Sequence, residues 1–417
     1  MTDAKIVESL KGRRELNING VDFGRVIAAE SYDTSARGYA KNLAKCMLYR
    51  FTVSVPEDAV WENTFVYALN FAKRRDYDEI RDTFMKFCPE FTLVNVDRKK
   101  DGVLFIPKGF AILGRFFRYL LCGTPQPFMT AVLVTEYNPL RRMLEKSIKW
   151  DEVKLFGDFC DAHTSESIAT QLAMNGGAKT FTLQHGQYRV LSEGHENADC
   201  EAYKNFISDR LLAWGEATRR EFEKAGIDGR RIVPCGALKS FSRNRPMPKK
   251  ENTGVFGVIM CGEAGAETNR NLIKTANGIA AKYGLKYMIR FHPRNPVENY
   301  LPLADEKYLS EYVSRIENTA YAEKVDFSLV HMTGVFIEML SINSPIFIYD
   351  DEYLEDVFRI KPFCFNSVES FSEVYDRYSD TDKLRAEQYP YYTFFNNSEN
   401  LEENYRSAVD ALRNEKA

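Results

Sequence analysis

In the first half of the chain, apolar residues gather in short continuous runs instead of alternating with polar residues. Strands that are apolar throughout are typical of parallel sheets covered by helices on both faces. Residues 161–177 add a helical pattern, with Thr164 or Ser165 as the N-cap and a glycine pair as the stop. The pattern predicts a doubly wound α/β domain. We expect strands at residues 64–69, 91–96, 130–135, 153–157 and 180–183.

The alternation of strands and helices begins again after residues 241–253, whose proline and charge content is typical of an exposed linker. We therefore predict two Rossmann-like domains, residues 1–240 and 254–385. Residues 386–417 are expected to form C-terminal helices that cross back to the first domain. The expected strands of the second domain are residues 255–260, a strand ending at His292, residues 327–331 and 345–349, with helices at 270–283, at 304–323 and from Val335 on.

The composition argues against several classes of protein. The 417 residues include 56 basic and 59 acidic side chains, a formal net charge of −3, so we expect no nucleic-acid partner. No apolar run approaches the roughly 20 residues that cross a bilayer, and the N-terminus lacks the apolar core of a secretory signal, which predicts a cytoplasmic protein. The eight cysteines form no CxxC pair, so we expect reduced core thiols.

Two histidines, His185 and His292, each end a predicted buried strand. Open α/β sheets bind ligands at the carboxyl ends of their strands, and histidine has the side-chain pKa nearest to physiological pH. Gly186 lets a ligand approach the backbone closely, and Pro293 ends the strand beside His292. Both histidines are therefore candidates for a functional site. The alternative for each is a partly buried side chain bonded to a backbone carbonyl.

Two groups of residues in the second half would suit the phosphates of a nucleotide. Arg290, His292 and Arg294 would share one face of a strand and donate hydrogen bonds to a diphosphate, unless they lie in a solvated basic loop. Gly262 and Gly265 precede a helix whose first amides could bind phosphate, although a plain tight turn explains them equally well.

A third group is Thr333, Gly334 and Glu338, at the start of a predicted helix. The first amides and the Thr333 hydroxyl could face a phosphate, and Glu338 could reach ribose hydroxyls. In the structural alternative Thr333 is an N-cap and Glu338 is a solvated helix residue.

The order of these motifs resembles bacterial glycosyltransferases of the GT-B type over roughly residues 130–350. The relatives in style are CDP-glycerol glycerophosphotransferases, capsule KDO transferases and capsular sialyltransferases, whose fold has two Rossmann-like domains facing a central cleft. The resemblance rests on GlnHisGlyGln at 184–187, AspArgLeuLeuAlaTrpGlyGlu at 209–216, PheHisPro at 291–293, and Thr333, Gly334 and Glu338 before SerProIlePheIleTyr at 344–349.

The resemblance implies roles for individual residues. His292 and Pro293 match the HP motif, and Thr333 matches the Ser/Thr motif, both of which bind a cytidine nucleotide in those relatives. Glu338 falls where such folds often hold the ribose, and His185 matches the acceptor-facing histidine that is proposed as a base. The Asp/Glu-Asp/Glu-Gly base motif of sialyltransferases is not evident, which leaves the catalytic base in doubt.

Glycosyl transfer needs a base for the acceptor hydroxyl and positive groups for the departing phosphate. His185 is our candidate for the base, and its competitors are Glu136, Asp158 and Asp161, each expected after a strand, where a carboxylate could also cap a helix or orient His185. No AspXaaAsp motif suggests a metal clamp, and residues 349–356 are expected to be a solvated acidic helix start. We predict no metal and no cofactor.

The sequence therefore predicts a glycosyltransferase that moves a sugar from a CMP- or other nucleotide-activated donor to a growing bacterial surface polysaccharide, as in capsule biosynthesis. The alternatives are a polyol-phosphate transferase that uses a CDP-polyol, a nucleotide-sugar 2-epimerase, and a non-catalytic nucleotide-sugar-binding scaffold. Residues 108–121 form a basic amphipathic stretch. It is either a membrane-surface helix, where a lipid-linked acceptor would reside, or a core or interface helix.

Overall fold

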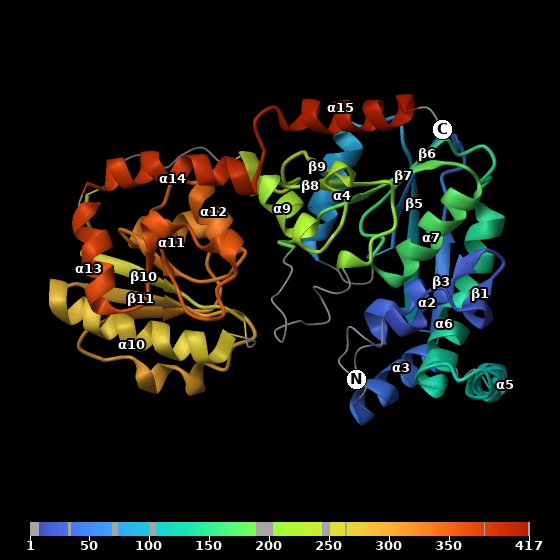
Figure 1. Ribbon diagram of the computed structural model, residues 1–417, viewed down its shortest axis with the longest axis horizontal. Helices are drawn as coiled ribbons and strands as arrows, with labels where there is room; N and C mark the ends of the chain where they lie inside the picture. Colours follow the sequence, from blue (N-terminus) through green and yellow to red (C-terminus); the bar gives the residue numbers. More distant parts are fainter. Residues whose placement is uncertain are drawn as a thin grey trace. The chain divides into compact units, whose positions relative to one another are not determined.

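The computed structural model describes residues 8–31, 35–68, 74–100, 106–188, 203–243, 251–262, 265–378 and 380–415. The chain divides into two compact units (Figure 1). The first unit comprises Met1–Lys239 and Glu399–Ala417, and the second comprises Ser240–Ser398. Each unit is built around its own sheet.

The first unit contains a seven-stranded sheet in the order β3-β5-β4-β6-β7-β8-β9, in which only β3 is antiparallel to its neighbour. The strands are β3 (Tyr49–Ser54), β4 (Asn63–Tyr67), β5 (Thr92–Lys100), β6 (Leu155–Asp158), β7 (Lys179–Leu183), β8 (Arg210–Ala213) and β9 (Ile232–Pro234), with a small hairpin of β1 (Asn17–Ile18) and β2 (Val21–Asp22). The helices are α2 (Phe23–Val26), α3 (Ala36–Leu48), α4 (Arg75–Phe87), α5 (Ile106–Leu121), α6 (Pro127–Ser147), α7 (Thr164–Asn175), α9 (Glu216–Lys224) and α15 (Leu401–Asn414).

Helices cover both faces of this sheet, and neighbouring residues of one strand therefore belong to two different cores. On β4, Val66 packs in a core with residues of α6 and α7, whereas Phe65 packs in a core with residues of α4 and α15. A strand that is buried on both sides has no polar face, which explains its continuous apolar run.

One predicted strand is wrong. Residues 130–135 lie inside the helix α6, whose residues from Met129 to Asn138 are all buried. A helix buried on every side shows no amphipathic periodicity, so a short apolar stretch of it looks like a buried strand. Pro127, at the first position of α6, was the available signal for a helix start.

The second unit contains a six-stranded sheet in the order β12-β11-β10-β13-β14-β15, and all of its strand pairs are parallel. The strands are β10 (Val255–Ile259), β11 (Lys286–Arg290), β12 (Leu309–Val313), β13 (Ser328–Val330), β14 (Ile346–Tyr349) and β15 (Cys364–Phe365). The helices are α10 (Ala266–Tyr283), α11 (Asn318–Lys324), α12 (Val335–Ser341), α13 (Val368–Arg377) and α14 (Thr381–Phe395). Figure 1 shows α10 and α12 on opposite sides of β10 and β11. The predicted α/β class with two Rossmann-like, doubly wound sheets is thus confirmed.

The predicted helix at 304–323 is also wrong, because β12 occupies its centre and α11 begins only at Asn318. β12 is an edge strand, and Ser310, Glu311 and Tyr312 are exposed. An edge strand with three consecutive exposed residues has no apolar run for a sequence pattern to detect.

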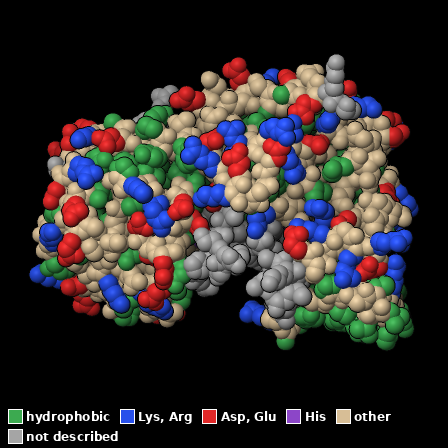
Figure 2. All heavy atoms as spheres, in the orientation of Figure 1, with side chains coloured by type: hydrophobic (Ala, Val, Ile, Leu, Met, Phe, Trp, Pro, Cys, Tyr) green, Lys and Arg blue, Asp and Glu red, His purple; other side chains and the backbone are tan. Residues whose placement is uncertain are grey.

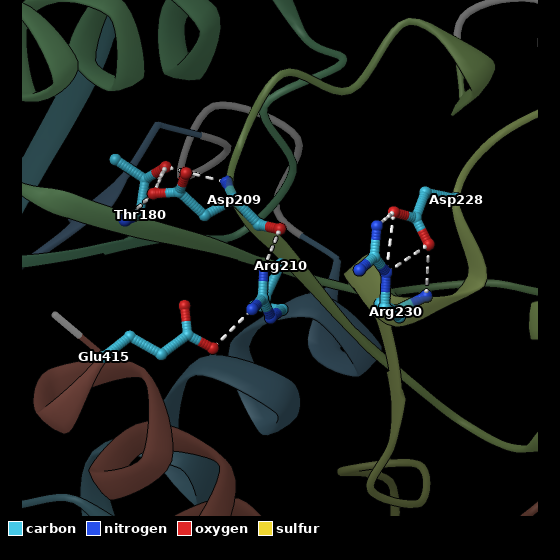
Figure 3. A network of polar contacts seen from close by, with 6 residues as sticks. All are labelled: Thr180, Asp209, Arg210, Asp228, Arg230 and Glu415. Atoms are coloured by element: carbon cyan, nitrogen blue, oxygen red, sulfur yellow. Dashed lines mark hydrogen bonds and ion pairs between the residues drawn. The ribbon is translucent and has the colours of Figure 1, made fainter. Parts of the chain in front are cut away.

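The C-terminal helix α15 is part of the first unit. The Tyr405 hydroxyl donates a hydrogen bond of 2.7 Å to the Gly236 carbonyl. Just beyond α15, Glu415 forms an ion pair with Arg210 on β8, and the neighbouring Asp209 is bonded to β7 (Figure 3). The apolar face of α15 buries Leu401, Tyr405, Val409 and Leu412 against the core that contains Phe65 and Phe181.

Candidate functional sites in the two units

The backbone at the carboxyl end of β7 is held by Gln184, the residue before His185. The Trp214 amide donates to Gln184 Oε1 at 2.7 Å, and the Trp214 indole donates to the Gln184 carbonyl at 2.9 Å. Gln184 Nε2 in turn donates to the Gly186 carbonyl at 2.7 Å. These bonds join the ends of β7 and β8 and fix the backbone on both sides of His185. Our sequence analysis missed Gln184, although it is part of the GlnHisGlyGln motif.

The His185 side chain is buried among aromatic rings and is only 3% exposed. The Tyr188 hydroxyl lies 3.0 Å from Nδ1, and the Tyr203 hydroxyl lies 3.4 Å from Nε2. Burial, aided by His163 and the cations Lys239 and Arg74, holds the pKa of His185 well below its usual value. The lowered pKa favours the neutral form of the imidazole.

Asp158 and Asp161, at the end of β6, are both fully buried. Asp158 accepts hydrogen bonds from Thr170 and, at 2.6 Å, from Thr182. Asp161 accepts bonds from the Ser208 amide at 2.6 Å and the Ser208 hydroxyl at 2.7 Å. Burial raises the pKa of both carboxyls, and the nearby Asp161 raises that of Asp158 further. Both side chains thus hold the first unit together through internal bonds.

Glu136 does not follow a strand, as we had expected, but lies in the middle of α6. It is buried there and forms an ion pair with Arg98 of β5. This pair joins α6 to the antiparallel edge of the sheet, so Glu136 has a structural role in the first unit.

Three side chains in the first unit could hold a metal ion: Cys160, His163 and His185. Their ligand atoms all lie within 4.8 Å of one another. Thiolate and imidazole ligands suit zinc. The tyrosine hydroxyls beside both nitrogens of His185 would compete with a metal for that ring. The sequence analysis missed this grouping. Cys160 and His163 are separated by two residues in the loop after β6, but only the fold brings His185, which follows β7, beside them.

In the second unit, the residues after β10 and β11 lie side by side. A methyl group added at the Cα atom of Gly262 would lie 3.7 Å from Cε1 of His292, so this glycine lies against the imidazole. The Asn295 side chain donates to the Cys261 carbonyl at 2.8 Å and ties the two loops together. Gly265 is the N-cap of the 18-residue helix α10.

The prediction that Arg290, His292 and Arg294 share one strand face is wrong. β11 ends at Arg290, and the chain then forms a turn in which the Asn295 amide donates to the His292 carbonyl at 2.9 Å. Pro293 lies in this turn and is exposed, as is Arg294. A proline one residue after His292 favours such a turn.

Arg290 and Glu338 are instead connected through Asn318, the first residue of α11. Arg290 Nη1 donates to Asn318 Oδ1, and Asn318 Nδ2 donates to Glu338 Oε2. Burial lowers the pKa of Arg290 from its usual value. Our sequence analysis did not identify Asn318, because it lay within the stretch 304–323 that we expected to be one helix.

His331 and Asp351 complete this edge of the sheet. His331 follows β13, and its Nδ1 lies 3.6 Å from Cys261 Sγ, while its Nε2 lies 2.9 Å from Asp351 Oδ1. Although burial opposes the effect, bonds from His331 and Thr268 lower the pKa of Asp351. The expected solvated acidic helix is not found, because no helix lies in the described residues between the end of β14 at Tyr349 and a single 3-10 turn at Asp356–Phe358. Asp351 instead orients His331.

Thr333 and Gly334 follow His331 after one intervening residue, Met332. Gly334 is the N-cap of α12, and the Phe336 amide donates to the Thr333 carbonyl at 3.1 Å. Glu338 lies in the first turn of α12, the helix that begins after the loop containing His331.

One cavity in the first unit, of about 350 Å³, contains none of the predicted site residues. It is lined by Gly20, Asp22, Arg25, Gln171, Met174, Asn175, Phe206, Ile207 and Arg231.

No family model and no curated protein matches this chain. Among solved structures, it is similar to the S. aureus MnaA–UDP co-structure, with 11% identity, a TM-score of 0.47, and coverage of 84% of this chain and 95% of the other. It is also similar to a UDP-N-acetylglucosamine 2-epimerase from Rickettsia bellii, with 13% identity, a TM-score of 0.48, and coverage of 85% of this chain and 98% of the other. The pneumococcal O-GlcNAc transferase GtfA in complex with UDP and GlcNAc has 12% identity and a TM-score of 0.43, with coverage of 66% of this chain and 60% of the other. Epimerases and glycosyltransferases thus both occur among the similar structures.

Proposed function

We propose that this protein is a metal-independent glycosyltransferase of the GT-B type, which moves a sugar from a nucleotide-activated donor to an acceptor hydroxyl. The observation that carries the proposal is the strand order of the second unit. The chain runs outward from β10 to β12 and then returns to β13, on the other side of β10. Open α/β sheets bind nucleotides at the carboxyl ends of the strands where the order reverses in this way.

The residues at this reversal suit the phosphates of a nucleoside diphosphate or monophosphate. The first amides of α10, after Gly262 and Gly265, carry the positive end of a helix dipole, and His292 lies against Gly262. Both would stabilise the phosphate that departs with the nucleotide. Glu338, positioned by Asn318, would accept hydrogen bonds from the ribose hydroxyls.

His185 in the first unit is the proposed base. The Tyr203 hydroxyl lies 3.4 Å from Nε2, and the acceptor hydroxyl would bind to Nε2 in its place. In the proposed reaction the neutral imidazole takes the hydroxyl proton while the acceptor oxygen bonds to the anomeric carbon. The bond from that carbon to the donor phosphate breaks, and its electron pair leaves with the nucleotide. Asp158 and Asp161 would support the backbone at the end of β6 without taking the proton.

We extend the proposal to the acceptor, a growing bacterial surface polysaccharide. This extension rests on the motifs that resemble capsule and glycerophosphate transferases, from GlnHisGlyGln at 184–187 to PheHisPro at 291–293. A CDP-polyol would be bound by the same residues. The bond that breaks would then be the one between the two phosphates, so that the polyol and its phosphate are transferred and CMP leaves.

The test is thermal stabilisation by CMP, CDP, UDP, GDP and ADP. A nucleotide at 100 times its Kd should stabilise the protein by about 2.7 kcal/mol. We expect one nucleotide to do so, and we expect the shift to be lost in His292→Ala. Lys286→Ala is the matched control, because Lys286 is exposed at the opposite end of the same strand, β11. If none of the five nucleotides stabilises the wild-type protein, the proposal is wrong.

The stabilising nucleotide then defines the donor panel for a turnover assay. Transfer that requires an added acceptor supports the glycosyltransferase, whereas conversion of the nucleotide sugar without acceptor would identify an epimerase. Binding without either reaction, in the presence of cell-wall and capsule oligosaccharides, would identify a scaffold.

A further inference from the structure

One face of α5 is apolar and exposed to solvent. Of the ten large apolar side chains that are strongly exposed in the described part of the chain, five lie on this helix. They recur at helical spacing and therefore share one face. Figure 2 shows an apolar patch in the region where Figure 1 places α5. The five are Phe110 (73% exposed), Leu113 (51%), Phe117 (58%), Leu120 (52%) and Leu121 (88%).

The opposite face of α5 is anchored in the first unit, so the helix cannot rotate to bury the exposed side chains. Ile112 and Tyr119 are buried in the core beneath it. The Lys108 ammonium donates to the carbonyls of Cys46 and Tyr49, at 2.5 and 3.0 Å. Arg115 donates to the Thr135 hydroxyl of α6 at 3.1 Å. These contacts fix the apolar face in an outward position.

The surroundings of the apolar face are basic. Neither α5 nor α3, which packs against it, contains an acidic residue. Of the three basic residues of α5, Lys108 and Arg115 are bonded on the anchored face. Arg118 is exposed at the edge of the apolar face, and Arg37 and Lys41 of α3 are also exposed. The whole chain, by contrast, has a net charge of −3. The positive charge is therefore a local property of α3 and α5.

We infer that α5 lies in the surface of a bilayer that contains anionic lipids, with its apolar face at the level of the upper acyl chains. A helix with an apolar face and a basic border binds such surfaces in two ways: the apolar face is buried among the lipids, and the basic side chains are attracted to the anionic headgroups. A second copy of the protein fits less well, because two basic helix pairs would face each other. No described helix is long and apolar enough to cross a membrane, so the contact is peripheral.

The test is co-sedimentation with vesicles of phosphatidylcholine alone or mixed with phosphatidylglycerol. It needs no nucleotide and is independent of the proposed enzymatic activity. We expect binding to the mixed vesicles, weakened by salt, and a loss of roughly tenfold or more in the partition coefficient of the double variant Phe117→Ser, Leu121→Ser. Both side chains are exposed, so the fold should be retained. Val60→Ser is the control, since Val60 is 66% exposed and lies outside α3 and α5.

Absence of binding to the mixed vesicles, or equal binding by the double variant, overturns the inference. Light scattering without vesicles measures the oligomeric state of the wild-type protein and of the double variant. If the wild-type protein is a dimer and the double variant is a monomer, the apolar face binds a second copy and the bilayer proposal is wrong. A charge-reversal variant, Arg118→Glu, separates the electrostatic contribution from the apolar one, because it should weaken binding to the mixed vesicles and leave the apolar face intact.

Discussion

His185 and His292 each follow a parallel strand in one of the two units, but their surroundings differ. His185 is buried, with a tyrosine hydroxyl near each nitrogen, and its pKa is held well below the usual value. His292 is half-buried in a turn, and its Nδ1 lies 3.2 Å from the Arg294 amide that donates to it. The same residue at the same kind of strand end is thus enclosed by aromatic rings in the first unit and partly exposed in the second, and this difference is the reason for the different roles that we propose for the two histidines.

The largest expected effects separate the two histidines. His185→Ala should lower kcat by roughly 100- to 10,000-fold, because a positioned base contributes about that much. It should leave the nucleotide-induced thermal shift unchanged, whereas His292→Ala should abolish that shift. Steady-state kinetics and thermal melts on both variants provide the measurements. If His185→Ala also loses nucleotide stabilisation, the two sites do not have the separate roles that we assign.

Glu338→Gln should sharpen the assignment in the second unit. The variant keeps the shape of the side chain but removes the charge that would accept ribose hydroxyl bonds, so we expect the nucleotide Kd to rise roughly tenfold. Isothermal titration measures it. Glu311→Gln, an exposed acidic residue on β12, is the matched control and should bind normally. An unchanged Kd in Glu338→Gln would remove Glu338 from the site.

Glu166 allows a pH test of the first unit. It is buried at the start of α7, accepts a bond from the Ala68 amide at 3.1 Å, and burial raises its pKa from 4.5 to about 8. A raised folded-state pKa stabilises the fold below the unfolded value and loses that contribution as the pH rises through about 8. Glu166→Gln should therefore gain at least about 1 kcal/mol over the wild-type protein at alkaline pH. Urea unfolding on both sides of this window measures the difference, and parallel stability curves for the two proteins would contradict it.

The smallest expected effect is that of metal removal. If His185 acts as a base, chelation should change kcat by less than roughly twofold, and Cys160→Ser should behave similarly. Activity assays with and without chelator, together with elemental analysis of the protein, provide the test. Bound zinc whose removal abolishes turnover would assign Cys160, His163 and His185 to a metal centre instead.

Much of the fold followed from local patterns in the sequence. The strands β4, β5, β6, β7, β10, β11, β13 and β14 all overlap predicted apolar runs. Two of the elements that we predicted wrongly have opposite burial. Residues 130–135 belong to a helix that is buried on all sides, and β12 is an edge strand with an exposed centre. In both cases the tertiary position removed the alternation of polar and apolar residues that a sequence pattern needs.

The sequence by itself determined that the chain forms two α/β units and that His185 and His292 come at strand ends, because apolar runs and turn residues are local signals. Only the tertiary structure decided what surrounds those histidines. Asn318 joins Arg290 to Glu338, Asp351 orients His331, and aromatic rings from several elements enclose His185. These partners are distant in the chain, and their contacts arise from strand order and burial, which no short stretch of sequence encodes.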